Sequence, residues 1–66
     1  MKNYRGKEVK LVCSSTGFEM SVGSEVLSFR GERSVITSIA PPHKSSASGY
    51  VNNYYASVYN LEFVEL

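Results

Sequence analysis

The segment from Pro41 to Gly49 gathers more chemically versatile side chains than any other part of the chain. The residues here that we expect to contact a ligand are His43, Lys44, Ser45, Ser46, Ser48 and Gly49. Serine hydroxyls and the backbone N–H groups near a glycine form concave sets of donors for phosphate, and the lysine and histidine add positive charge. The segment therefore predicts a loop that binds an anion, and the alternative is a flexible connection without a ligand.

Tyrosines follow this loop, and two arginines precede it. These residues are Tyr50, Tyr54, Tyr55, Tyr59, Arg30 and Arg33. Small β domains hold single-stranded nucleic acid by stacking bases on aromatic rings, at about 1–3 kcal/mol per base. We expect Tyr50, Tyr54 or Tyr55 to stack on bases, with both arginines and Lys44 supplying positive charge. The alternative is that the tyrosines alternate into the core, and we expect at least one to be buried and at least one exposed.

Acid–base or nucleophilic catalysis needs residue types of which this chain has few. It contains one histidine, one cysteine, six glutamates and no aspartate. Cys13 would meet His43 only if the end of the first strand reached the loop, and a cysteine on an alternating strand face is usually a core residue. One histidine and one cysteine do not complete a four-ligand zinc shell. We therefore expect a binding protein and not an enzyme, with no cofactor and no metal.

Length, charge and cysteine content restrict the class of protein further. A chain of 66 residues holds one small domain, spanning residues 1–66, of which we expect residues 1–7 to be flexible. The lone Cys13 favours a reducing compartment, and charges interrupt every apolar stretch near the N-terminus. A formal net charge of +1 is not that of a dedicated duplex-DNA binder. The expectations are a cytoplasmic location, no membrane partner and a surface site.

The elements that must position these side chains are short strands. Val, Tyr, Phe and Ser are frequent and Ala is rare, which favours strands and turns over helices. Apolar residues alternate with polar ones over Glu8–Cys13 and again over Phe18–Val22, so each range predicts a strand. The second range fits a short strand or an extended arm, and in it we expect Phe18, Met20 and Val22 to face inward.

Turn signals divide the rest of the chain. The range Gly23–Ile39 predicts a hairpin that turns at Arg30–Arg33. Apolar residues lie on both faces of its second strand, so the sequence pattern does not decide which face is buried. Ala40–Gly49 predicts the longest loop, since its two prolines exclude a regular ladder. Asn52-Asn53 predicts a turn before a closing strand around Tyr59–Phe63.

About five short strands separated by turns favour an all-β domain, and at this size a small barrel removes the exposed sheet edges. We expect an SH3-like barrel of about five short strands. The spacing Gly23-x-x-Val26, then Gly31, then Val35-Ile36 resembles the strand, tight turn and strand of SH3-like and KOW-type domains. Because the domain has so little core, we also expect self-association through a strand edge, giving a homodimer.

Several motifs occur together in the last two thirds of the chain. They are Phe29-Arg30-Gly31-Glu32, Pro41-Pro42-His43-Lys44-Ser45-Ser46 followed by Gly49 and Val51, Tyr55-x-Ser57-Val58-Tyr59 and Leu61-x-Phe63-Val64. The combination resembles a group of short uncharacterised proteins encoded by tailed bacteriophages and prophages. In that group the loop ends Ser-Thr-Gly-Arg-Val and a later segment reads Tyr-Pro-Ser-Val, so that here Tyr50 replaces a loop arginine and Ala56 a proline. The resemblance implies a phage-type accessory protein that acts in a bacterial cytoplasm on a host machine.

Two hypotheses of function remain open from the residues alone. The first is a module for nucleic acid or a nucleotide phosphate, whose binding would depend steeply on salt because each phosphate contact releases a counterion. The second is a module that binds a host protein, and inhibits or redirects it, through a rigid loop and an exposed tyrosine patch. Binding of the second kind would depend much less on salt.

Overall fold

The chain folds into eight short strands and one short helix. The computed structural model describes residues 1–66. Its elements are β1 (Val9–Cys13), β2 (Glu19–Met20), β3 (Glu25–Leu27), β4 (Arg33–Val35), β5 (Ile39–Ala40), β6 (Tyr50–Val51), β7 (Tyr54–Tyr55), the 3-10 helix η1 (Ala56–Tyr59) and β8 (Leu61–Glu65). The predicted all-β class is confirmed. The four-residue η1 is the only helix, so no helix is long and apolar enough to cross a membrane.

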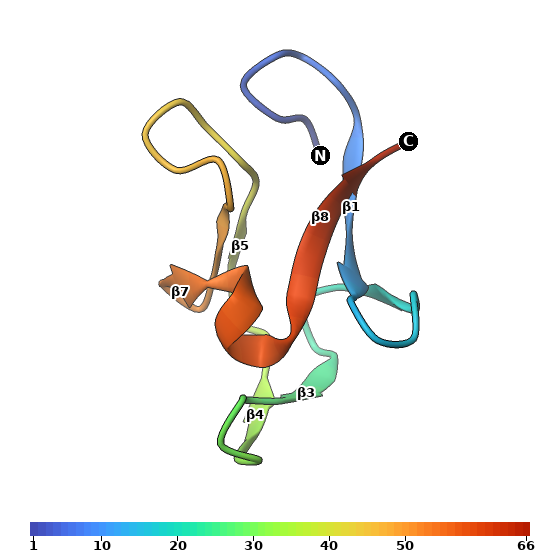
Figure 1. Ribbon diagram of the computed structural model, residues 1–66, viewed down its shortest axis with the longest axis vertical. Helices are drawn as coiled ribbons and strands as arrows, with labels where there is room; N and C mark the ends of the chain where they lie inside the picture. The colour runs from blue at the N-terminus through green and yellow to red at the C-terminus, as the bar shows by residue number, and fades with distance from the viewer.

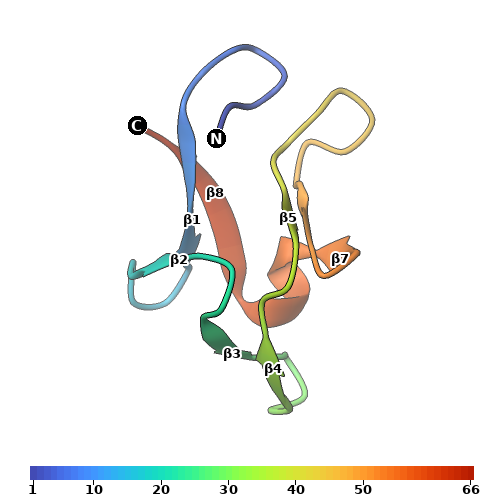
Figure 2. The same cartoon turned by 180° about the vertical axis from the view of Figure 1, so that it is seen from behind.

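The strands form three small antiparallel sheets, with strand orders β2-β1-β8, β3-β4 and β5-β6-β7 (Figures 1 and 2). The longest pairing joins the first strand to the last, with Val9 opposite Glu65 and Cys13 opposite Leu61. None of the sheets closes on itself, so the predicted SH3-like barrel of about five strands is not confirmed. Strands of two or three residues between turns are too short for a continuous ladder around a barrel.

One small core lies between the three sheets. Its buried residues are Leu11, Val26, Ile36, Val51, Ala56, Tyr59 and Leu61. Leu11 and Leu61 come from the first sheet, Val26 from the second and Val51 from the third, so each sheet covers one side of the same core. Only 12 of the 66 residues are buried. Because the apolar core is this small, polar contacts must also help to hold the sheets in place.

The second predicted strand is shorter than its alternation indicated. β2 contains only Glu19 and Met20, and Met20 is half-buried against the core. Phe18 and Val22, which we expected to face inward, are 70% and 63% exposed, so that prediction is wrong. Phe18 lies at the end of the pairing, where its carbonyl accepts a hydrogen bond from the N–H of Cys13 at 2.9 Å, and the paired segment stops at Met20. The pleat therefore does not continue to Val22.

The predicted turns occur where glycine and asparagine adopt positive φ. Gly31 has a φ of 80° in the turn between β3 and β4, and its N–H donates to Ser28 O at 2.8 Å. Asn52 and Asn53 have φ values of 52° and 67° in the two-residue turn between β6 and β7. Two successive residues with positive φ are typical of the tight hairpin turns that asparagine favours.

The side chain of Asn52 also ties this turn to a distant segment. Its Oδ1 accepts hydrogen bonds from the N–H of Thr37 (2.7 Å), the hydroxyl of Thr37 (2.9 Å) and the N–H of Ser38 (3.2 Å). Its Nδ2 donates to Val35 O at 3.0 Å. The amide of Asn52 therefore holds the chain after β4 against the β6–β7 hairpin.

Replacing Asn52 tests this tie, and Asn53 supplies a matched control in the same turn. Both Asn52→Ala and Asn53→Ala put alanine at positive φ, but only the first removes the amide hydrogen bonds. We expect Asn52→Ala to lower the free energy of unfolding by about 1–3 kcal/mol more than Asn53→Ala, as measured by urea denaturation. Equal losses in the two variants would show that the side chain of Asn52 contributes nothing beyond its backbone preference.

Candidate functional site

Three aromatic side chains, His43, Tyr50 and Tyr55, lie one against the next and are called here the aromatic ladder. The ring centroids of His43 and Tyr50 are 6.0 Å apart, and those of Tyr50 and Tyr55 are 5.3 Å apart with the rings stacked at 20°. The pairing of β6 with β7 places Tyr50 directly opposite Tyr55. His43 and Tyr50 are half-buried, whereas Tyr55 is 54% exposed. The ladder thus ends in an accessible ring.

The loop that carries His43 closes on itself. His43 and Ser46 exchange two backbone hydrogen bonds, each of 3.0 Å, and the hydroxyl of Ser45 lies 2.7 Å from His43 Nδ1. Lys44 and Ser45 stand exposed within the turn that these bonds close, and Ser48 is exposed further along the loop. A cation and a hydroxyl are therefore presented beside the aromatic ladder.

Two of the predicted ligand residues in this loop, Ser46 and Gly49, are buried. Ser46 is 8% exposed and its hydroxyl is buried without a hydrogen-bond partner. Gly49 is buried at a φ of 69°, and a Cβ built there would lie 2.7 Å from Ala40 O and closer still to the ring of Phe63. The absence of a side chain at Gly49 lets the loop pack on Phe63 of β8.

Gly49→Ala tests this packing, and Gly17→Ala is a control with the same backbone strain. Gly17 has a φ of 78° and nothing within 4 Å of a built Cβ. We expect Gly17→Ala to cost about 1 kcal/mol of stability from its positive φ. Gly49→Ala should cost about 1–3 kcal/mol more because Phe63 must move. Thermal unfolding of both variants measures the difference, and losses of the same size would contradict the packing role.

The other predicted site residues do not join the aromatic ladder. Successive residues of a strand point to opposite faces, so Tyr54 lies on the other side of β7 from Tyr55. Its ring meets the edge of Tyr59, with centroids 6.5 Å apart. Tyr59 is 8% exposed and Tyr54 is 59% exposed, which confirms that the tyrosines divide between core and surface.

Arg30 and Arg33 lie far from the loop that we expected them to assist. Arg33 begins β4, and Arg30 lies in the turn between β3 and β4. Figure 1 shows this hairpin at one end of the longest axis and the loop between β5 and β6 at the other. The two arginines therefore belong to a different surface from His43 and Lys44.

The N-terminal segment, which we expected to be flexible and did not assign to the site, lies beside the loop instead. The N–H of Tyr4 donates to Pro42 O at 3.1 Å. An open depression of about 350 Å³ lies between the two segments, with Tyr4, Arg5, Pro42 and Ala47 in its walls. The structure thus adds an aromatic ring and a cation at this end of the molecule.

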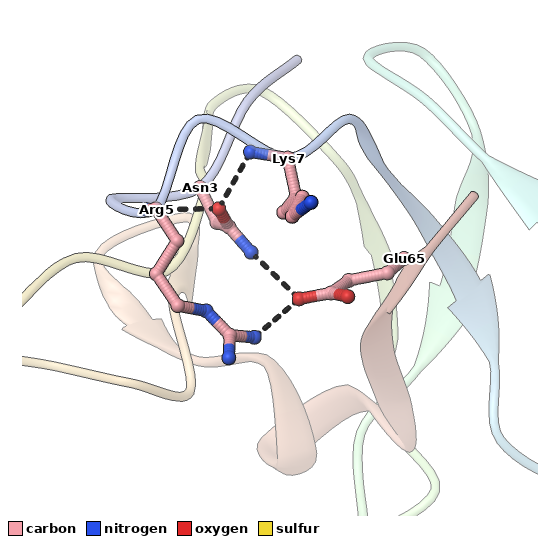
Figure 3. Close-up of polar contacts among 4 residues, drawn as sticks. All are labelled: Asn3, Arg5, Lys7 and Glu65. Carbon is pink, nitrogen blue, oxygen red and sulfur yellow. Dashed lines mark hydrogen bonds and ion pairs between the residues drawn. The ribbon is translucent and has the colours of Figure 1, made fainter.

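Asn3 holds that segment in place (Figure 3). Its Oδ1 accepts hydrogen bonds from the N–H groups of Arg5 and Lys7, both at 3.0 Å, and its Nδ2 donates to Glu65 at 3.2 Å. Arg5 forms an ion pair with the same carboxylate, so its charge is largely compensated. An asparagine that caps the N–H group two residues later is typical of a turn and was the available signal in the sequence.

Cys13 lies apart from the aromatic ladder. It ends β1, is partly buried and lines a cavity of about 210 Å³ together with Met20 and Tyr59. Figure 1 places this end of β1 away from the loop that carries His43, so the two residues do not form a catalytic pair. Hydrogen bonds from the Ser15 and Thr16 side chains, followed by those from their backbones, lower the pKa of Cys13 to about 6.

The pH dependence of Cys13 alkylation tests this assignment. Because the thiolate is the nucleophile, the rate with iodoacetamide should rise with an inflection near pH 6 in the folded protein and near about 8.5 in urea. Because the pKa of Cys13 is lower in the folded protein than in the unfolded chain, the thiolate stabilises the fold. This contribution to the free energy of unfolding is present above the pKa of the unfolded chain and is lost as the pH falls through about 6. Ser15→Ala should move the folded inflection upward. An inflection above pH 8 in the folded wild type would contradict the assignment.

The remaining observations do not add a further site. No three side chains of the types that bind metal ions gather anywhere in the chain. Comparison with protein-family models, with curated proteins and with solved structures finds no match to this chain. The aromatic ladder with Lys44 is the candidate site, since it combines an exposed ring with an exposed cation.

Proposed function

We propose that the protein is a small binding module for single-stranded nucleic acid or nucleotides. A base stacks on Tyr55 at the end of the aromatic ladder, and Lys44 contacts a phosphate. The observation that carries the proposal is the stacking of Tyr50 on Tyr55, which holds the exposed ring of Tyr55 in a fixed orientation. A preformed ring costs less conformational entropy on binding than a mobile side chain would.

Stacking supplies most of the affinity in this proposal. Each stacked base contributes about 1–3 kcal/mol, whereas the net charge is only +1 and Arg30 and Arg33 are remote from the ladder. A single strand loses about 0.7 units of log K per unit of log salt for each phosphate contact. With one to three contacts, from Lys44 and from Lys2 and Lys7 of the neighbouring N-terminal segment, which form no ion pair, the slope should lie between about −0.7 and −2. The salt dependence is thus shallower than we expected from the sequence, where both arginines were included.

Tyr55→Leu tests the stacking residue, and Tyr54→Leu is the matched control on the opposite face of the same strand. We expect Tyr55→Leu to weaken binding of a short labelled single-stranded oligonucleotide by about five- to 150-fold in fluorescence anisotropy. Tyr54→Leu should leave the affinity within about twofold. Equal effects of the two substitutions, or no binding by the wild type, would overturn the proposal.

Lys44→Glu separates the phosphate contact from the stacking contact. Lys44 is exposed, so the variant should fold normally. It should bind more weakly and lower the magnitude of the salt slope by about 0.7. If a mononucleotide competes with the oligonucleotide, one base with its phosphate is sufficient for binding. If only longer strands compete, the ligand is nucleic acid.

A protein partner is the second candidate. Phe18, Val22 and Phe29 are each more than 60% exposed, so each could offer an apolar contact to a partner. A host protein that is bound through these residues would be retained at high salt. Its binding would be unaffected by Tyr55→Leu.

The biological setting and the fold relationship are also part of the proposal. The motifs that resemble tailed-phage and prophage proteins support an accessory protein that acts in a bacterial cytoplasm. The turn at Gly31 between β3 and β4 supports a distant SH3-like relationship, in which the barrel is opened into separate sheets.

A further inference from the structure

The β3–β4 hairpin has one covered face and one open face. Directly opposed residues of an antiparallel pair share a face, and the face alternates along each strand. Val26 and Ser34 are opposed, and they lie on the side where Val26 is buried in the core. The opposite side carries Glu25, Leu27, Arg33 and Val35, which are all exposed and are called here the open face.

The four side chains of the open face have an ordered pattern. Glu25 is opposite Val35, and Leu27 is opposite Arg33. The two apolar residues therefore occupy one diagonal of the face, and the two opposite charges occupy the other. Leu27 and Val35 are 54% and 50% exposed. Neither Glu25 nor Arg33 forms an ion pair within the chain, so both charges are available to a partner.

We propose that the open face binds the open face of a second copy of this chain, about a two-fold axis that runs along the diagonal from Leu27 to Val35. This rotation lays Leu27 on Leu27 of the second copy and Val35 on Val35. It exchanges the other two corners, so Glu25 meets Arg33 of the second copy and Arg33 meets Glu25. One operation thus satisfies both the apolar pair and the charged pair.

Other two-fold axes in the plane of the hairpin do not have this property. An axis along the strands would lay each charge on an apolar side chain, and so would an axis across them. An axis along the charged diagonal would lay Glu25 on Glu25 and Arg33 on Arg33, and like charges in contact across an interface cost several kcal/mol. The pattern of charges therefore selects one arrangement, in which the two hairpins cross at a large angle, as in orthogonal sheet packing.

The size and place of the open face indicate a weak dimer that leaves the aromatic ladder free. A standard interface buries about 800 Å² on each partner, which is under a fifth of the 4458 Å² surface of this chain. A face centred on four side chains falls at or below that size, so we expect a micromolar dissociation constant. The hairpin projects at the end of the molecule opposite the β5–β6 loop (Figures 1 and 2), so the dimer would carry two separated ladders.

Charge reversal tests the two-fold arrangement. Glu25→Arg places arginine against Arg33 of the second copy, and Arg33→Glu places glutamate against Glu25. Each variant alone should dimerise at least about tenfold more weakly than the wild type in sedimentation equilibrium. An equimolar mixture of the two variants should dimerise as well as the wild type, because each copy then supplies the charge that the other lacks. Both substitutions are at exposed positions, and circular dichroism checks that the variants are folded.

Disulfide trapping gives a second readout of the same axis. With Cys13→Ser as background, Leu27→Cys would place two thiols against each other across the axis. Oxidised glutathione should therefore convert it to a covalent dimer faster than it converts Glu25→Cys, whose thiol faces Arg33. A wild type that stays monomeric at millimolar concentration would overturn the proposal. So would a mixture of the charge variants no more dimeric than its components, or equal trapping at positions 25 and 27.

Discussion

Four hydrogen bonds to one amide, that of Asn52, connect the β6–β7 hairpin to the chain that leaves β4. They matter because the apolar core is small: 12 of 66 residues are buried. Of the 33 backbone hydrogen bonds, only 14 lie within strands or helix, and the other 19 lie in turns and connections. A fold of this kind depends on directional polar contacts to set the position of one sheet against another, since hydrophobic burial favours compactness without fixing geometry.

The same amide lies between the two surfaces to which we assign binding. On one side it orders the hairpin that carries Tyr50 and Tyr55. On the other it donates a hydrogen bond to the carbonyl of Val35, a residue of the open face, and accepts one from the N–H of Thr37. Asn3 has a comparable part at the opposite end, where it joins the N-terminal loop to β8 through Glu65. Both asparagines are at positions where a side-chain amide can replace backbone pairing that the short strands do not supply.

The features that sequence predicted well are those decided by neighbouring residues. Asn52-Asn53 marked a tight turn because asparagine tolerates positive φ, and Gly31 marked a hairpin for the same reason. Alternation located β1 because its pairing with β8 is long enough to keep a regular pleat. At least one tyrosine is buried and at least one is exposed, as expected, but strand alternation does not explain this, because the buried Tyr59 lies in η1 and the successive Tyr54 and Tyr55 are both exposed.

What the sequence did not reveal depends on contacts between distant segments. Arg30 and Arg33 are near the loop in sequence, but the hairpin points to the other end of the molecule. Gly49 was expected to contact a ligand, and only the position of Phe63 shows that it is a packing residue. Phe18 and Val22 follow a strand pattern, but the length of β2 is set by where β1 can pair with it.

The pairing of β1 with β8 has a consequence for how the protein forms. Nearly the whole chain separates the two strands of this longest ladder, so closing it carries the loop entropy of almost every residue between them. Topologies of this kind fold slowly for their size. During synthesis β1 has no partner strand longer than β2 until residues 61–65 have left the ribosome. The β1–β8 ladder therefore cannot form on the nascent chain before its last strand is free of the ribosome.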